Sequence, residues 1–197
     1  MKFISKSVSE MKITIISGTD RPGSLSDKVS NFVCSKYQDS GVQSNVASMT
    51  EFPLSSVAGG KYGKDIPEVK AFNNQLLDSD GWVMVIPEYN GSFPGILKLF
   101  VDYLPFPGGF NGKPISFIGE GDGSFGGLRA VEQMQMVASY RDAHIFPERV
   151  FIPRVRKNFD EDEGIKDEMV QSLLNKQISG FIDYIHRLSA VAEDSEK

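Results

Sequence analysis

The fold of this chain is decided near its N-terminus by the stretch Ile13-Thr14-Ile15-Ile16-Ser17, which Gly18 closes. A continuous run of β-branched residues that ends at a glycine is typical of a strand with both faces buried. Similar runs, two strong and two weaker, recur along the chain at residues 42–47, 82–86, 115–118 and 143–152. Strands of this kind predict a parallel sheet that helices cover on both sides.

Helical spacing of apolar residues separates these strands. It predicts helices over residues 29–37, 66–77, 94–104, 128–137 and 165–185, with a loop over residues 50–65. The repeated order of strand and helix predicts an α/β fold, a three-layer doubly wound sheet of five parallel strands. We expect the flavodoxin-like strand order 2-1-3-4-5, in which ligands bind at the carboxyl ends of the strands. That rule selects the loops over residues 18–26, 87–93 and 119–127.

Composition limits the classes of protein that remain. The 197 residues, 40% hydrophobic and 24% charged, suit a globular chain, and the net charge of -5 argues against binding to nucleic acid. One cysteine and two histidines argue against a disulfide framework and a metal centre. Without an apolar stretch long enough for a membrane or a secretion signal, we expect a cytoplasmic protein. Residues 1–10 look like a polar extension, residues 11–192 like one domain and residues 193–197 like a charged tail.

The first of the three loops offers donors for an anion. Thr19, Ser24 and Ser26 supply hydroxyls and Arg21 a guanidinium, between a strand end and a helix start. Free N–H groups at a helix N-terminus and a fixed guanidinium favour phosphate oxygens. The alternative is ordinary capping, because Ser24-Leu25-Ser26-Asp27 matches the capping pattern [ST]-x-x-[DE] and Ser26 alone would also make a good N-cap residue. The Walker pattern of ATP-binding loops is absent.

The second and third loops are rich in glycine. In the second loop, glycines allow backbone N–H groups to approach a flat ligand, although a turn with incidental polarity explains the same residues. The third loop contains the pattern G-x-G-x-x-G from Gly121 to Gly126. Because it follows a late strand, we interpret it as a loop over a ligand face rather than a dinucleotide fingerprint.

The helix over residues 94–104 is apolar on nearly every side, and its charged residues are Lys98 and Asp102, which are spaced to form an ion pair. Because a helix of this kind must be buried all round, we expect a subunit interface there. The alternative is coverage by neighbouring loops of the same chain, such as residues 106–110.

Two segments together resemble the NADPH-dependent FMN reductase family. Residues 18–26 resemble the family's phosphate loop, and residues 87–98 resemble its flavin-edge loop and the helix after it. Residues 126–130 fit the third flavin-facing segment less specifically, and the resemblance covers residues 11–151. It implies a flavodoxin-like fold, bound FMN, NADPH or NADH as the reductant, and homodimers or homotetramers built partly through the third helix.

The resemblance also implies roles by position. Four residues would hold the FMN phosphate, namely Thr19, Arg21, Ser24 and Ser26. Five would line the isoalloxazine, mainly through backbone groups, namely Pro87, Glu88, Tyr89, Asn90 and Gly91, and four would close over the ring, namely Gly121, Asp122, Gly123 and Ser124. The chain departs from the family where Thr19 replaces a frequent Ser, where Ser26 replaces a common Asn, and at residues 99–103, whose bulkier side chains put the usual oligomer geometry in question.

The function that the resemblance implies is a flavin-dependent oxidoreductase. Hydride would pass from NAD(P)H to N5 of the bound FMN and then to a flavin, quinone, azo or metal-oxyanion acceptor by a ping-pong route. The flavin carries the chemistry, so we expect no catalytic side chain and no metal. The alternatives are a flavodoxin-like electron carrier and a regulatory flavin-binding protein. The acceptor stays open, and so does the choice of nucleotide, with candidates for a 2′-phosphate contact at Arg129, Arg141, Arg154 and Arg156.

Overall fold

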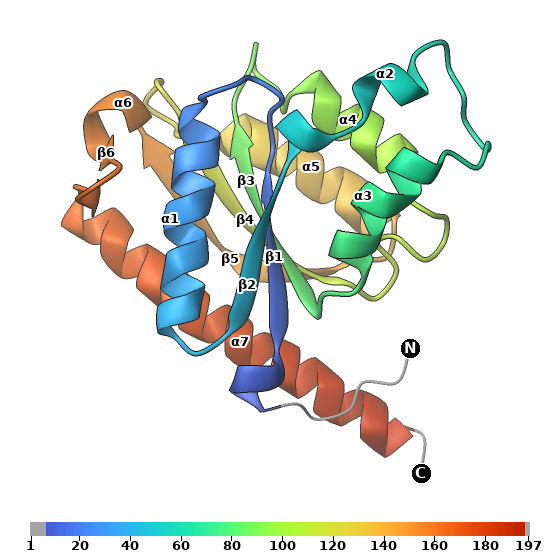
Figure 1. Ribbon diagram of the computed structural model, residues 1–197. Helices are drawn as coiled ribbons and strands as arrows, with labels where there is room; N and C mark the ends of the chain where they lie inside the picture. Colours follow the sequence, from blue (N-terminus) through green and yellow to red (C-terminus); the bar gives the residue numbers. More distant parts are fainter. Residues whose placement is uncertain (1–6, 196–197) are drawn as a thin grey trace.

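The structure is a computed structural model that describes the backbone of residues 7–195 and the side chains of residues 7–190. Five strands form one parallel sheet in the order β2-β1-β3-β4-β5 (Figure 1). Their bounds are β1 Lys12–Ser17, β2 Gln43–Ser48, β3 Gly81–Pro87, β4 Pro114–Gly121 and β5 His144–Pro153. The predicted flavodoxin-like, doubly wound fold is therefore confirmed.

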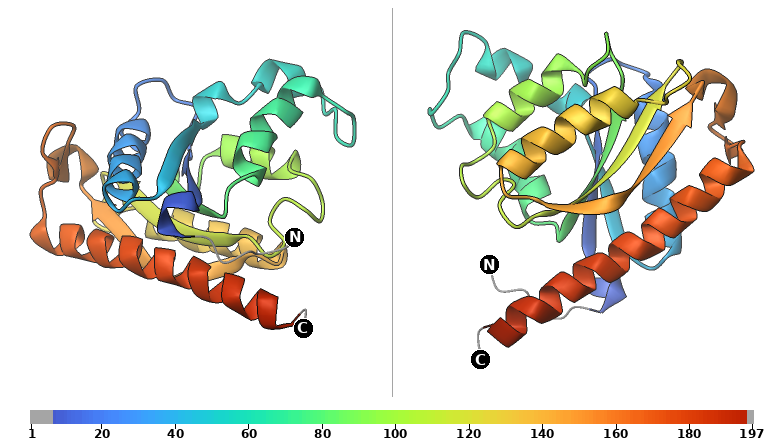
Figure 2. Two further views of the ribbon diagram at one scale, coloured as in Figure 1. Left: turned by 60° about the horizontal axis from the view of Figure 1, so that its bottom comes forward. Right: turned by 180° about the vertical axis from the view of Figure 1, so that it is seen from behind.

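Helices cover both faces of this sheet (Figures 1 and 2). One face carries α1 (Leu25–Asp39) and α7 (Glu168–Ser195), and the other carries α3 (Pro67–Leu77), α4 (Gly95–Asp102) and α5 (Leu128–Tyr140). Successive residues of β3 alternate between the two cores: Val83 packs with α1 and α7, and Met84 packs with the other helices. Because both faces are covered, every position of the strand is buried, which explains its unbroken apolar run.

The segment predicted as a loop over residues 50–65 contains two short helices. These are the 3-10 helix η2 (Met49–Glu51) and α2 (Leu54–Val57). Phe52, between them, packs edge-on against Phe72 of α3 and Phe100 of α4, with ring centroids 5.4 and 6.1 Å away. The prediction was wrong here because helices this short show no apolar periodicity.

The last predicted helix begins later than its apolar pattern indicates. Ile165 lies in β7 (Gly164–Ile165), which pairs with β6 (Phe159–Asp160) in a small antiparallel hairpin after α6 (Val155–Asn158). Asp167 then caps α7, since its Oδ1 accepts hydrogen bonds from the N–H groups of Met169 and Val170. A side-chain cap of this kind fixes where a helix starts.

The ends of the chain also differ from simple tails. The 3-10 helix η1 (Val8–Glu10) precedes β1, and Val8 packs against the core. Residues 1–6 of the expected extension and residues 196–197 of the expected tail lie outside the described residues, whereas residues 193–195 continue α7. No helix within the described part of the chain is long and apolar enough to cross a membrane.

The chain itself buries most of α4. Ile96, Leu97, Phe100 and Val101 are all at most 7% exposed in the single chain. The alternative interpretation, coverage by neighbouring segments, therefore accounts for these side chains. The expected ion pair forms, with Lys98 Nζ 2.6 Å from Asp102 Oδ1. A subunit interface at this helix stays a prediction.

Candidate functional site

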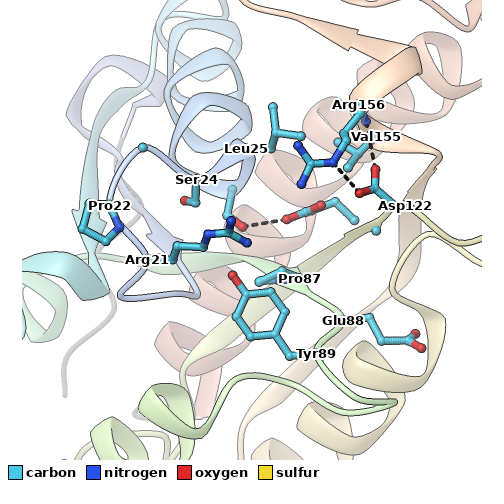
Figure 3. A pocket seen from close by; sticks show the side chains of 14 residues that line it. Arg21, Pro22, Ser24, Leu25, Pro87, Glu88, Tyr89, Asp122, Val155 and Arg156 are labelled. Carbon is cyan, nitrogen blue, oxygen red and sulfur yellow. Dashed lines mark hydrogen bonds and ion pairs between the residues drawn. The ribbon is translucent and has the colours of Figure 1, made fainter.

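The three loops selected from the sequence meet around one cavity at the carboxyl edge of the sheet (Figure 3). Its volume is about 280 Å³. The loop after β1, the end of β3, the end of β4 and the start of α6 line it, through Arg21, Pro22, Gly23, Ser24, Leu25, Ser26, Pro87, Glu88, Tyr89, Glu120, Gly121, Asp122, Val155 and Arg156.

The first loop presents the N-terminus of α1 to this cavity. Ser24, and not Ser26, is the N-cap residue, because its side chain accepts a hydrogen bond from the N–H of Asp27. Arg21 points into the cavity (Figure 3) and forms no ion pair with any described residue. A helix N-terminus beside an unpaired guanidinium has the chemistry of an anion site.

Thr19 lies behind the cavity rather than in its lining. It is fully buried, and its Oγ1 lies 3.0 Å from the Tyr89 hydroxyl. The same oxygen accepts a hydrogen bond from the backbone N–H of Arg21. Thr19 thus joins the first loop to the second, a role that the resemblance did not imply.

The second loop is held by α5. Gln133 donates to the carbonyl of Gly91 and accepts from Ser92 Oγ, at 3.1 and 2.5 Å. Arg129 forms an ion pair of 3.2 Å with Glu88. Pro87, Glu88 and Tyr89 line the cavity, whereas Asn90 and Gly91 lie outside its lining and have positive φ angles of 52° and 77°. The turn interpretation therefore describes the backbone of these two residues.

The third loop lines the cavity with two of its four predicted residues, Gly121 and Asp122, while Gly123 and Ser124 are exposed outside the lining. Gly126 and Gly127 have positive φ, and a Cβ at Gly127 would meet the backbone N of Glu120 at 2.6 Å. These glycines allow the loop to fold back on β4, which is a structural reason for the G-x-G-x-x-G pattern.

The sequence did not identify Glu120 and Val155 as site residues, and it offered Arg156 as a candidate for a nucleotide phosphate contact without placing it beside the flavin loops. Glu120 is 5% exposed, and its Oε1 accepts a hydrogen bond of 2.6 Å from Ser26 Oγ. Burial raises the pKa of the Glu120 carboxyl, and the Ser26 hydrogen bond partly opposes that shift. Arg156 pairs with Asp122 at 2.6 Å. A glutamate that ends an apolar strand was the one available signal, since α6 carries no motif.

The arginine candidates for a nucleotide phosphate separate in space. Arg156 lines the cavity. Arg129 is occupied by Glu88 and stacks on Phe125, and Arg141 stacks on Phe106 outside the lining. Arg154 is exposed with a φ of 48°.

Within the described residues, no group of three or more His, Cys, Asp or Glu side chains is placed to hold a metal ion.

Comparison with known proteins assigns this site to a family. The sequence profile of the NADPH-dependent FMN reductase family matches residues 11–157, which is more than half of the chain. The chain belongs to this family. The predicted resemblance is thereby confirmed, and family membership makes the protein an oxidoreductase with FMN and NAD(P)H as the implied cofactors.

Individual relatives agree with this assignment. The chain is 30% identical to a 2-hydroxy-1,4-benzoquinone reductase of Burkholderia sp over 83% of its length and 90% of the relative. It is 26% identical to an NAD(P)H-dependent FMN reductase of Pseudomonas aeruginosa, over 91% and 97% of the two chains. The solved structure of FerB, a flavoenzyme NAD(P)H:(acceptor) oxidoreductase from Paracoccus denitrificans, superposes with a TM-score of 0.76 at 20% identity, covering 90% and 98%. This last match supports the fold.

Proposed function

We propose that this protein binds FMN in the cavity formed by the loops after β1, β3 and β4 and uses NAD(P)H to reduce a small quinone. One observation carries the proposal. The anion site, which consists of Arg21 and the N-terminus of α1, lines the same cavity as the loop Pro87–Tyr89. When bound, the flavin would accept hydride at N5 from NAD(P)H and pass the electrons to the acceptor in a ping-pong sequence.

The residues present fit this cofactor. Arg21 has no carboxylate partner among the described residues and is free to pair with a phosphate. The amides of Asn90 and Gly91 donate no hydrogen bond to any described residue, whereas the amide of Tyr89 is bonded to the carbonyl of Ser92 at 2.8 Å. The amides of Asn90 and Gly91, next to the cavity wall that Pro87–Tyr89 form, are therefore the free donors of this loop that would stabilise negative charge on a flavin edge reaching beyond the lining residues.

Bracing by α5 would keep the flavin-edge loop in place. The hydrogen bonds of Gln133 and the ion pair between Arg129 and Glu88 hold the second loop without a ligand. A binding loop that is already ordered loses less conformational entropy when the ligand arrives. A quinone acceptor is suggested by the benzoquinone reductase among the relatives. A cytoplasmic location and a homo-oligomer remain predictions from the sequence.

The experiment that tests the function separates reduction from re-oxidation. The FMN-loaded protein is mixed with NADPH or NADH without oxygen, and 1,4-benzoquinone or a one-electron acceptor protein is added afterwards. We expect the flavin absorption to bleach with a nicotinamide nucleotide and to return after one equivalent of quinone. Flavin that NAD(P)H does not bleach would contradict the proposal and favour an electron carrier.

A further inference from the structure

Glu120 carries a buried carboxyl that lies beside the N-terminus of α1, where the cofactor phosphate would bind. It lines the cavity from β4 and is 5% exposed. Its one hydrogen bond among the described residues comes from Ser26, the second residue of α1, at 2.6 Å. A carboxyl and a phosphate that share one helix N-terminus are two anions at a site that favours one.

Around the Glu120 carboxyl, few positive charges are free to offset the negative charge of a phosphate. The cavity lining holds the guanidinium groups of Arg21 and Arg156 and the carboxyls of Glu88, Glu120 and Asp122. Asp122 is paired with Arg156, and Glu88 is paired with Arg129 of α5. Arg21 alone of these cations has no carboxylate partner. If Glu120 were ionised, Arg21 would therefore face both a carboxylate and a phosphate that carries a charge of about -2 at neutral pH.

We propose that Glu120 is a cofactor-binding residue that holds a proton when FMN is bound, so that FMN binding takes up a proton from solution. This inference rests on the proposed function, and it concerns a residue that the family resemblance did not point to. Burial and the charge of Asp122 raise the pKa of the Glu120 carboxyl and so favour its neutral form, whereas the hydrogen bond from Ser26 and the charge of Arg156 oppose this shift.

The hydrogen bond between Glu120 and Ser26 gives the proton a structural role. An ionised carboxylate can only accept hydrogen bonds, so the Ser26 hydroxyl has to donate its hydrogen bond to Glu120. A protonated carboxyl can instead donate to Ser26 Oγ, which frees the hydroxyl hydrogen to bond a phosphate oxygen. Proton uptake by Glu120 thus removes one negative charge and supplies one donor at the N-terminus of α1.

Calorimetric titration with FMN tests this inference. Titrations in buffers of different ionisation enthalpy, above about pH 7 where the phosphate is already dianionic, report the protons taken up. We expect an uptake that approaches about one proton per FMN, and a Kd that rises with pH by up to about tenfold per unit. Riboflavin, which lacks the phosphate, is expected to take up much less.

The variant Glu120→Gln isolates the carboxyl, and Glu132→Gln is its matched control on the exposed side of α5. The amide of Gln donates to Ser26 as a protonated carboxyl does. The variant should therefore take up no proton, bind FMN as tightly as the unchanged chain near pH 7, and bind it more tightly near pH 9. Glu132→Gln should behave like the unchanged chain.

Three results would overturn the inference. One is FMN binding by the unchanged chain without proton uptake, which decides the matter even if Glu120→Gln fails to fold. Another is equal uptake with riboflavin, and a third is unaltered uptake in Glu120→Gln. In each of these cases FMN still binds, so the proposed function stands. A chain that binds no FMN at any pH would overturn both.

Discussion

The side-chain oxygens of Thr19 and Tyr89 lie 3.0 Å apart and join the loop after β1 to the loop after β3. Thr19 is fully buried and Tyr89 is half-buried, so the bond is partly shielded from water. We expect Tyr89→Phe and Thr19→Val each to lower the free energy of unfolding by about 0.5–1.5 kcal/mol, the usual net contribution of a hydrogen bond. Urea denaturation measures this, and the double variant should lose less than the sum. Strict additivity would show that the two hydroxyls do not interact.

Arg21 is expected to recognise the phosphate of FMN. Arg21→Ala should weaken FMN binding about 10- to 100-fold, since a hydrogen bond to a charged group contributes about 1.5–3 kcal/mol. Riboflavin binding should change little. Flavin fluorescence titration measures both, with the exposed Arg187→Ala on α7 as the matched control. An equal loss for FMN and riboflavin would place Arg21 away from the phosphate.

Gly127 is required by the backbone of the third loop. Its φ is +86°, and an added Cβ would meet the backbone N and O of Glu120 at 2.6 and 2.9 Å. We expect Gly127→Ala to lower the free energy of unfolding by about 1–3 kcal/mol. At Gly123 an added Cβ meets nothing within 4 Å, so Gly123→Ala should stay within about 0.5 kcal/mol of the unchanged chain. Equal stability of the two variants in thermal or urea unfolding would contradict this interpretation.

The α4–α5 face is where we expect a second subunit. Met136 and Tyr140 of α5 are 66% and 85% exposed there, beside an apolar cavity that Phe93 and Val101 also line. Met136→Lys should therefore shift the mass of the protein in solution from a dimer or tetramer toward a monomer. Met169→Lys is the control, because Met169 is 73% exposed on α7, far along the chain from this face. A monomeric unchanged chain, in sedimentation or light scattering, would refute the predicted oligomer.

The sheet could be predicted from the sequence because its central strands are buried on both faces. Each residue of β3 faces one of two helical layers, so the whole strand is apolar and stands out. The hairpin of β6 and β7 could not be predicted, since Ile165 fits helical spacing equally well. The position of Ile165 in a strand is set by Gly164, which has a φ of +78° and packs against Phe32.

The candidate site could be predicted only as far as its loops carry motifs. Arg21 and Tyr89 lie in segments with a recognisable pattern, and both line the cavity. Arg156 lines it too, but it reaches the site through tertiary packing of α6 beside the third loop, where Asp122 holds it. Asn90 has the expected sequence pattern but lies outside the lining, because the turn gives it a positive φ. Local sequence therefore identifies the loops, and packing decides which side chains face the ligand.

The loops after β1, β3 and β4 are proposed to form one flavin site that a nicotinamide nucleotide can reduce. The most direct measurement is the visible spectrum of the purified protein after incubation with FMN and removal of unbound flavin, followed by NADPH or NADH without oxygen. We expect one retained FMN per chain, whose absorption bands disappear on mixing with the nucleotide. A protein that retains no flavin, or flavin bands that persist after the nucleotide is added, would contradict it.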